Sequence, residues 1–151
     1  MVHDGAMDAV NIDGVRKLTT NDALQSLKLN VDIKNSNKIL TQLISNEENF
    51  IRERICFGKF IDEKLVSRGA IMSIAGNYAS VGAFYTIETE RKKGYASDII
   101  KATIMEASRH SKNACLFVRN NNSNAINLYK KLGFICTGHA WFHDIGTGLS
   151  P

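Results

Sequence analysis

The loop formed by residues 89–97 is the part of the chain best suited to bind an anion. It links a strand-like stretch to a helix-like stretch, and the start of a helix presents unpartnered backbone N–H groups to a negative charge. Gly94 lets a ligand approach the backbone closely, and Arg91, Lys92 and Lys93 add positive charge beside it. Neither the P-loop pattern nor the dinucleotide-binding glycine pattern is present. The loop therefore predicts a phosphate site of another kind, with an ordinary charged turn as the alternative.

The positive charge of the chain is concentrated around this loop. Residues 91–131 hold nine Lys or Arg and two Asp or Glu, a net charge of +7, while the other residues sum to −3 and the whole chain to +4. Such a concentration favours an anionic partner, either a nucleic acid or a small molecule that carries phosphates. A solvated basic face is the alternative.

Three linked patterns lie between residues 81 and 134. A strand-like run at residues 81–86 precedes the loop, in which residues 91–96 read R-K-K-G-Y-A. Asn122 stands seven residues before Tyr129, and the helix-like stretch closes on K-L-G-F at residues 131–134. Together these patterns resemble the GNAT superfamily of acetyl-CoA-dependent N-acetyltransferases, whose loop reads R/Q-x-x-G-x-G/A. The resemblance covers about residues 13–145.

The resemblance implies that acetyl-CoA donates its acetyl group to a primary amine by direct attack in a ternary complex. Its phosphates, about four negative charges, would be held by backbone amides of the loop, and its pantetheine arm would pair with the preceding strand. Gly82 would help that strand part from its neighbour. Tyr129 would protonate the leaving thiolate. The residues expected to bind the cofactor are Phe84, Tyr85, Thr86, Arg91, Lys92, Lys93, Gly94, Tyr95, Ala96, Ser97, Asn122 and Lys131.

No general base follows from the sequence. Some members of the superfamily carry a Glu eleven residues before the first residue of the loop motif, and this chain has Ser80 there. Glu88 and Glu90 are expected to be solvated charges beside the loop, so water or a side chain from the early helices could equally take the proton. The missing carboxylate leaves a second interpretation open, an acyl-CoA-binding module with weak or no catalysis. A nucleic-acid binder ranks last, because no recognition motif is present.

The hydrophobic periodicity predicts an α/β (α+β) fold around a mixed central sheet, in the order β-α-α-β-β-β-α-β-α-β. A parallel strand-helix-strand unit is expected late in the chain. The predicted helices have caps at Thr20, Ser36 and Ser123, and Gly133 is predicted to end the last of them. Ala23, Leu24 and Leu27 are expected to face inward on the first helix, and Ile39, Leu40, Leu43 and Ile44 on the second. The strands are predicted at residues 15–18, 51–61, 65–75, 78–87, 114–118 and 134–145.

Length and composition predict one acyltransferase-like domain over residues 1–151, with residues 1–12 as a flexible N-terminal extension. Hydrophobic residues make up 44% and charged residues 23%, which argues against a disordered chain. No apolar run exceeds five residues, so no membrane span is expected. The start lacks the basic and apolar regions of a secretory signal, which makes the cytoplasm the expected location. Cys56, Cys115 and Cys136 are too far apart to predict a zinc site or a disulfide framework.

His139 and His143 are expected at the rim of the acceptor site. Residues four apart on a strand are separated by about 13 Å, too far for both to bind one metal ion. No metal is therefore expected, and the missing recognition motif and the short apolar runs give no reason to expect a nucleic acid or membrane partner. The acceptor is expected to be a small-molecule or peptide amine of unspecified identity, and exposed strand edges are compatible with a homodimer.

Overall fold

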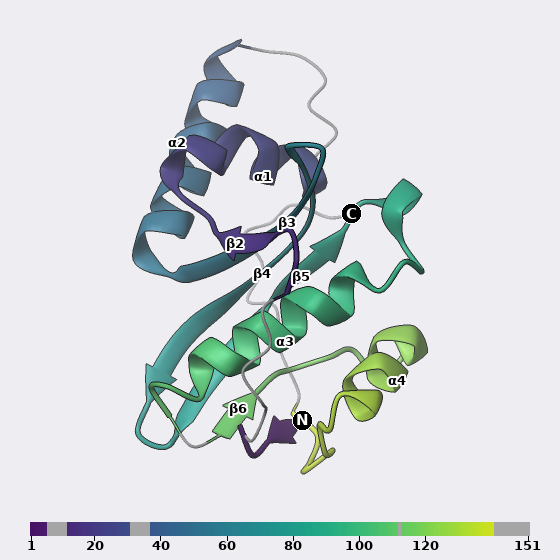
Figure 1. Ribbon diagram of the computed structural model, residues 1–151. Helices are drawn as coiled ribbons and strands as arrows, with labels where there is room; N and C mark the ends of the chain where they lie inside the picture. The colour runs from purple at the N-terminus through teal and green to yellow at the C-terminus, as the bar shows by residue number, and fades with distance from the viewer. Residues whose placement is uncertain (6–11, 31–36, 112, 141–151) are drawn as a thin grey trace.

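A six-stranded sheet with helices on both faces forms the molecule (Figure 1). The computed structural model describes residues 1–5, 12–30, 37–111 and 113–140. The strands lie in the order β1-β6-β5-β4-β3-β2, with β5 and β6 parallel and all other neighbours antiparallel. The predicted fold class is confirmed, as is the late parallel unit. The strands are β1 (Val2–His3), β2 (Val15–Lys17), β3 (Ile55–Ile61), β4 (Lys64–Ala75), β5 (Tyr78–Thr86) and β6 (Asn113–Cys115).

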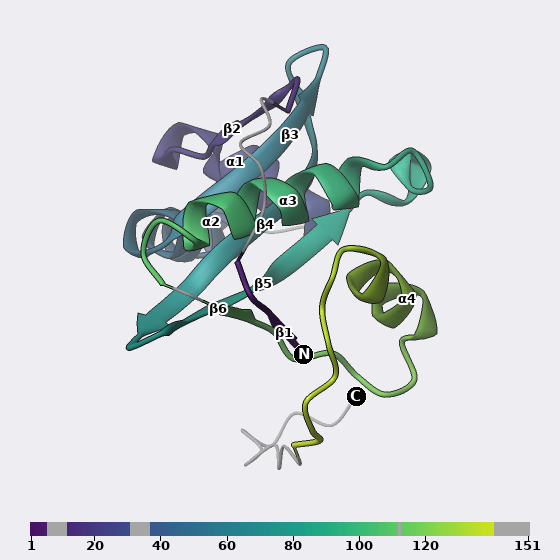
Figure 2. The same cartoon turned by 60° about the horizontal axis from the view of Figure 1, so that its bottom comes forward.

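Two apolar clusters hold the helices against opposite faces of the sheet. Figure 2 shows α3 on the near side of the strands and α1 and α2 on the far side. One cluster joins the sheet to α3 and α4 through residues such as Val81, Ile104 and Phe134, and the other joins it to α1 and α2 through Ile51 and Leu65. The helices are α1 (Ala23–Asn30), α2 (Asn37–Glu53), α3 (Tyr95–Ala107) and α4 (Ser123–Lys131), with 3-10 turns η1 (Thr20–Asp22) and η2 (Glu88–Glu90).

The hairpins that join β3, β4 and β5 turn at residues 62–63 and 76–77, in the gaps between the predicted strands. Asp62 and Glu63 both have positive φ, 46° and 63°, as a two-residue turn between antiparallel strands requires. Gly76 takes φ +54° in the next turn. These short connections keep β5 in the middle of the sheet, where its end can meet α3 and α4.

Several predicted boundaries were wrong. Ile51 and Glu53 belong to α2, and β3 begins at Ile55. Ile51 is buried because it lies seven residues after Ile44, on the same face of α2. An inward-facing residue fits a strand as well as a helix, so the predicted strand at residues 51–61 began too early. Thr19, not Thr20, is the capping residue before the first helix: it caps the 3-10 turn η1 that leads directly into α1, with Asp22 closing a capping box.

The inward face predicted for the early helices is partly correct. Ala23 and Leu27 are buried, but Leu24 is 40% exposed and Ile39 of α2 is 60% exposed. The remaining three positions predicted to face inward on α2, Leu40, Leu43 and Ile44, are half-buried. The predicted cap at Ser36 lies outside the described residues.

The edge of the sheet beside β6 also differs from the prediction. Val2 and His3, expected in a flexible extension, pair with Cys115 and Ala114 instead. An unpaired strand edge exposes backbone polar groups, and β1 satisfies them here. A last strand was predicted at residues 134–145. Residues 134–140 form no strand, and the only β pairing among them is an isolated bridge between Ile135 and Val2. Residues 141–145 of that prediction lie outside the described residues.

Asp22 should make the fold less stable at acidic pH than at neutral pH. Its carboxylate accepts two hydrogen bonds from Arg16, at 2.7 and 2.8 Å, and one from the Thr19 N–H at 2.8 Å. The side-chain hydrogen bond from Arg16 is the main reason that the pKa of Asp22 lies below its usual value. This stabilisation is therefore complete above the unfolded pKa and is lost as pH falls through the lower folded pKa.

We expect Asp22→Asn to lower the free energy of unfolding by about 1.5 kcal/mol at pH 7, a modest value because Arg16 is half exposed. Urea unfolding of both proteins from pH 7 to pH 2 measures this difference, which should vanish below the folded pKa. A difference that stays constant to pH 2 would assign the effect to packing instead of charge.

Candidate functional site

The parallel strands β5 and β6 separate soon after they meet. Their pairing covers only Tyr78, Ala79 and Ser80 of β5, which then continues for six residues to Thr86. Beyond Ser80, the β6 side of β5 has no strand partner among the described residues. The end of β5 is thereby left open on that side, as the resemblance led us to expect.

A β-bulge shapes this open part of β5. Arg68 pairs with Tyr85 and Ala70 with Gly82, so Ala83 and Phe84 together stand opposite one residue, Gly69. Ala83 has φ +53°, which is uncommon for a residue other than glycine. A bulge re-aims the side chains that follow it. The Phe84 ring packs toward α4, whereas Tyr85 packs against the cluster under α1 and α2.

The space beside β5 is a cavity of about 620 Å³ between β5, the loop before α3, and helices α3 and α4. Its size is in the range of small-molecule sites. Eleven of the thirteen residues predicted for the site line it: Phe84, Tyr85, Thr86, Arg91, Lys92, Gly94, Tyr95, Ala96, Ser97, Asn122 and Tyr129. Lys93 and Lys131 do not. Five lining residues were missed: Glu90, Ile100, Asn124, Ala125 and Leu128. Ala125 could have been found, because it lies four residues before Tyr129 on the same face of the helix.

The loop before α3 takes two left-handed residues to reach the helix. Lys92 has φ +62° and Gly94, the N-cap, has φ +86°. The N–H of Asp98 donates to the Gly94 carbonyl at 3.1 Å, so the helix starts at Tyr95. The first three helical N–H groups, those of residues 95–97, have no acceptor within the helix. All three of these residues line the cavity.

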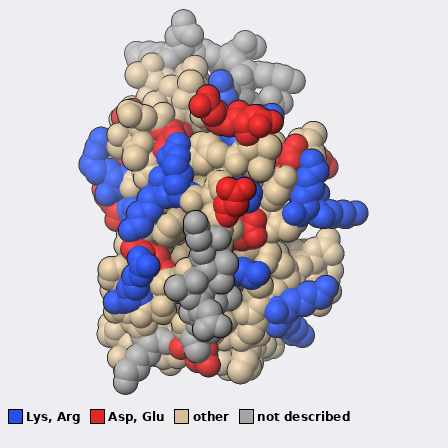
Figure 3. Space-filling model, in the orientation of Figure 1, with Lys and Arg blue, Asp and Glu red and all other residues tan. Residues whose placement is uncertain are grey.

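Side chains of the loop fasten it to the strand and balance its charge. Arg91 Nε donates to the Thr86 carbonyl at 3.1 Å, and its guanidinium lies 5.8 Å from the centre of the Tyr85 ring. Lys93 Nζ donates to Glu90 at 2.9 Å, and this hydrogen bond raises the pKa of Lys93. Lys93 is thus held in an ion pair with Glu90 beside the cavity. Figure 3 shows Lys and Arg side chains over this loop and over α4, with others on the opposite side of the same view.

Helix α4 brings Tyr129 to the cavity. Asn122 caps the helix, its Oδ1 accepting from the Ala125 N–H at 3.1 Å, so the predicted cap at Ser123 is wrong by one residue. Gly133, at φ +92°, ends the helix as predicted: its N–H bonds to the Lys130 carbonyl, and the following residue bonds back to the Tyr129 carbonyl.

Tyr129 is 9% exposed and sits between two aromatic rings. Its ring centre is 6.1 Å from that of Phe84 and 5.7 Å from that of Phe134. Burial raises the pKa of the Tyr129 hydroxyl above its usual value, so the phenol is protonated at neutral pH. A protonated hydroxyl beside an open cavity can act as a proton donor.

The carboxylates near the site do not form an evident general base. Ser80 pairs with Cys115 before the strands separate. Glu88 is exposed, and Glu90, which lines the cavity, is paired with Lys93.

A second cavity, of about 830 Å³, lies against the other face of α4 and includes none of the thirteen predicted residues. It is lined there by Ile126 and Lys130, and His139 also lines it. His143 lies outside the described residues. Within the described ranges, no group of three His, Cys, Asp or Glu side chains is placed to hold a metal ion. None of the described helices is long and apolar enough to cross a membrane.

Comparison with known proteins adds family relationships to this geometry. A family model described as "FR47-like protein" matches residues 61–142, more than half of the chain. A streptothricin acetyltransferase from Escherichia coli is 32% identical over 94 residues, which are 62% of this chain and 54% of that protein. The chain thus spans about half the length of this curated relative.

Two solved structures show the same fold at low sequence identity. The ribosomal-protein-alanine N-acetyltransferase of Brucella melitensis matches with a TM-score of 0.68 at 16% identity, over 87% of this chain and 98% of that one. The PaiA N-acetyltransferase of Thermoplasma acidophilum, in complex with coenzyme A, matches with a TM-score of 0.60 at 19% identity, over 80% and 88%. With the family model covering the open end of β5, the loop, α3 and α4, the chain belongs to the FR47-like family of the GNAT acetyltransferase superfamily.

Proposed function

We propose that this chain is an N-acetyltransferase that moves the acetyl group of acetyl-CoA to a primary amine. One observation carries the proposal: the cavity beside the open end of β5 is lined both by the first turn of α3 and by Tyr129 of α4. The first turn offers backbone N–H donors to an anion, and Tyr129 offers a protonated hydroxyl. An acyl donor with a phosphate end and a thioester end needs both.

The residues around the cavity fit acetyl-CoA. A Cβ added to Gly94 would meet no heavy atom within 4 Å, so the backbone there is open to a diphosphate. Arg91 and Lys92 line the same region and supply positive charge. Residues 84–86 of β5 have no β6 partner, which leaves backbone groups for a pantetheine arm to pair with as an added strand.

In the proposed reaction, bound acetyl-CoA would supply the thioester, and the chain would orient and polarise it. The amine nitrogen bonds to the acetyl carbon and the carbon–sulfur bond breaks. Backbone N–H groups near the bulge at Phe84 stabilise the negative charge that develops on the carbonyl oxygen. Tyr129 gives its proton to the departing sulfur and regains one from water, while the amine loses a proton to water. No other co-reactant is required.

Two measurements test this function. We expect calorimetry at low ionic strength to detect binding of coenzyme A, and a thiol-trapping reagent to detect coenzyme A released from acetyl-CoA in the presence of an acceptor. The acceptor panel should include streptothricin and an alanine peptide, because the two similar proteins are named for streptothricin and for a ribosomal-protein alanine. Absence of coenzyme A binding by the folded chain would refute the proposal.

Ser80, at the position where some relatives carry a carboxylate, supports a second candidate, an acyl-CoA-binding module with weak or no turnover. This candidate predicts coenzyme A binding without thiol release from any amine in the panel. A thermal shift with acetyl-CoA but none with oligonucleotides would separate both candidates from a nucleic-acid binder.

We propose that residues 1–151 form one acyltransferase-like domain. Lys93 and Lys131 do not line the cavity and contribute positive charge around the cofactor site. The three cysteines are unpaired, which is compatible with a reducing cytoplasm. A homodimer would be seen as a doubled mass in solution by light scattering.

A further inference from the structure

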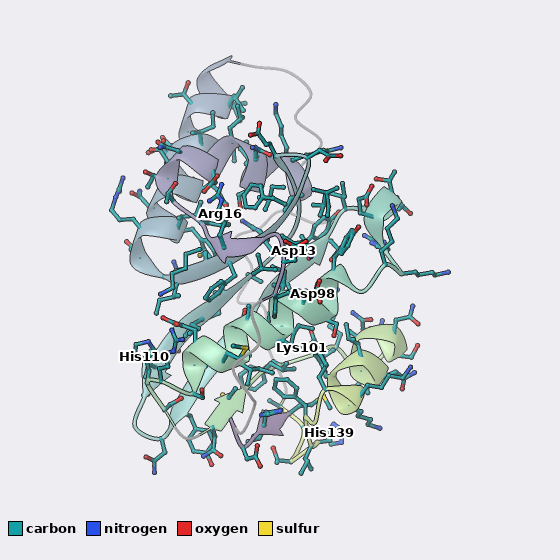
Figure 4. All side chains as sticks on the ribbon, in the orientation of Figure 1. Asp13, Arg16, Asp98, Lys101, His110 and His139 are labelled. Atoms are coloured by element: carbon teal, nitrogen blue, oxygen red, sulfur yellow. The ribbon has the colours of Figure 1, made fainter. Side chains whose placement is uncertain are left out.

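Lys59 is a buried lysine of β3 whose side chain reaches across to the start of α3. It is 7% exposed, and its ammonium donates to the Asp13 carbonyl oxygen at 2.6 Å. The same nitrogen lies 3.1 Å from Asp98 Oδ2 and 5.3 Å from the centre of the Tyr95 ring. Figure 4 shows Asp13 close to Asp98, where the segment before β2 passes the start of α3. A buried ammonium is costly unless it is paired, so these contacts are a requirement of the fold.

Two of these partners belong to the helical turn that faces the cavity. Tyr95 is the first residue of α3 and lines the cavity. Asp98 lies three residues later, and its N–H closes the first turn onto Gly94. Residues three apart stand on one side of a helix, so Lys59 holds this turn from the sheet side. The free N–H groups of residues 95–97 belong to the same turn.

Asp98 also has an electrostatic consequence. It is the acidic residue in the first turn of α3, and its side chain is 30% exposed. A carboxylate stabilises a helix start, but it opposes a second negative charge that binds there. Lys59 balances Asp98 with an ammonium that itself does not line the cavity.

We propose that Lys59 is a positioning residue for the diphosphate of the acyl donor: through Tyr95 and Asp98 it fixes the first turn of α3, and it cancels the Asp98 charge beside the anion. This inference rests on the proposed function, because it presupposes that the turn binds the diphosphate. It predicts that Lys59 affects binding of ligands with phosphates and leaves binding of the pantetheine arm unchanged.

The test compares Lys59→Met, Asp98→Asn and the double variant. We expect Lys59→Met to weaken coenzyme A binding about tenfold in calorimetry, because the Asp98 charge is then uncompensated. Inhibition by pantetheine, which lacks the diphosphate, should stay within about twofold of wild type, and kcat at saturating acetyl-CoA within about threefold. The double variant should return to within about threefold of wild-type affinity, since neither charge remains.

Lys101→Met is the matched control, because it removes a positive charge that lies on α3 itself, three residues after Asp98 (Figure 4). An equal loss of coenzyme A affinity in Lys101→Met would overturn the inference, as would equal losses for pantetheine and coenzyme A in Lys59→Met. A double variant as weak as Lys59→Met would show that the uncompensated Asp98 charge is not the cause of the lost affinity, and would overturn the charge cancellation proposed for Lys59.

Asp98→Asn keeps the test decisive if Lys59→Met does not fold. With the carboxylate gone and Lys59 in place, coenzyme A should bind about two- to fivefold more tightly, and weaker binding contradicts the inference. A wild-type chain that binds no coenzyme A refutes the proposed function and this inference with it. Wild-type binding together with insensitive variants overturns this inference alone.

Discussion

Tyr129→Phe is expected to lower kcat about a hundredfold, at the lower end of what a general acid contributes, while the KM for acetyl-CoA changes little. The substitution removes the hydroxyl and keeps the ring, so the contacts with Phe84 and Phe134 at 6.1 and 5.7 Å remain. Cofactor affinity and folding should therefore be preserved. Steady-state thiol release at saturating acetyl-CoA and acceptor measures the effect.

Tyr78→Phe is the control for this variant, since Tyr78 starts β5, is exposed and does not line the cavity. It should retain wild-type kcat. The wild-type protein should also keep the Tyr129 hydroxyl, the proposed acid, protonated throughout the neutral range, because burial raises the pKa of this group. A loss of kcat on the alkaline side should appear only above about pH 10. Unchanged turnover in Tyr129→Phe would remove this residue from the mechanism.

The elements that position the site were predictable because each combines a periodic pattern with local turn chemistry. Gly133 illustrates this: the left-handed residue that ends α4 is required by the chain reversal, and glycine is the residue that adopts it at least cost. The loop before α3 was recognised in the same way, through Gly94. Their agreement with the structure follows from interactions between near neighbours in the sequence.

Features that depend on distant parts of the chain were missed. The bulge at Ala83 has no sequence signal, because alanine does not favour positive φ and the bulge depends on pairing with β4. Pairing of Val2 with Cys115 is likewise a contact between residues far apart in the sequence. Lys59 resembled any polar residue of a strand, and only the packing of β3 against α3 and against the segment before β2 gives its buried ammonium its partners.

Gly94→Val should raise the KM for acetyl-CoA about thirtyfold, which corresponds to about 2 kcal/mol of strain or displaced contact. Gly94 has φ +86°, a conformation that a β-branched residue rarely adopts. The valine either distorts the first turn of α3 or places its side chain in the open space assigned to the diphosphate. The step after binding involves Tyr129 on α4, so kcat at saturation should fall by less than about threefold.

Gly76→Val separates loss of cofactor binding from backbone strain. Gly76 also has positive φ, +54°, and an added Cβ there would also meet nothing within 4 Å, but it lies at the opposite end of β5 from the loop. Both variants should lose a similar amount of stability in thermal melting, and Gly94→Val alone should lose affinity for acetyl-CoA. An equal rise of KM in both variants would attribute the effect to general destabilisation. A wild-type KM in folded Gly94→Val would place the diphosphate elsewhere than at the start of α3.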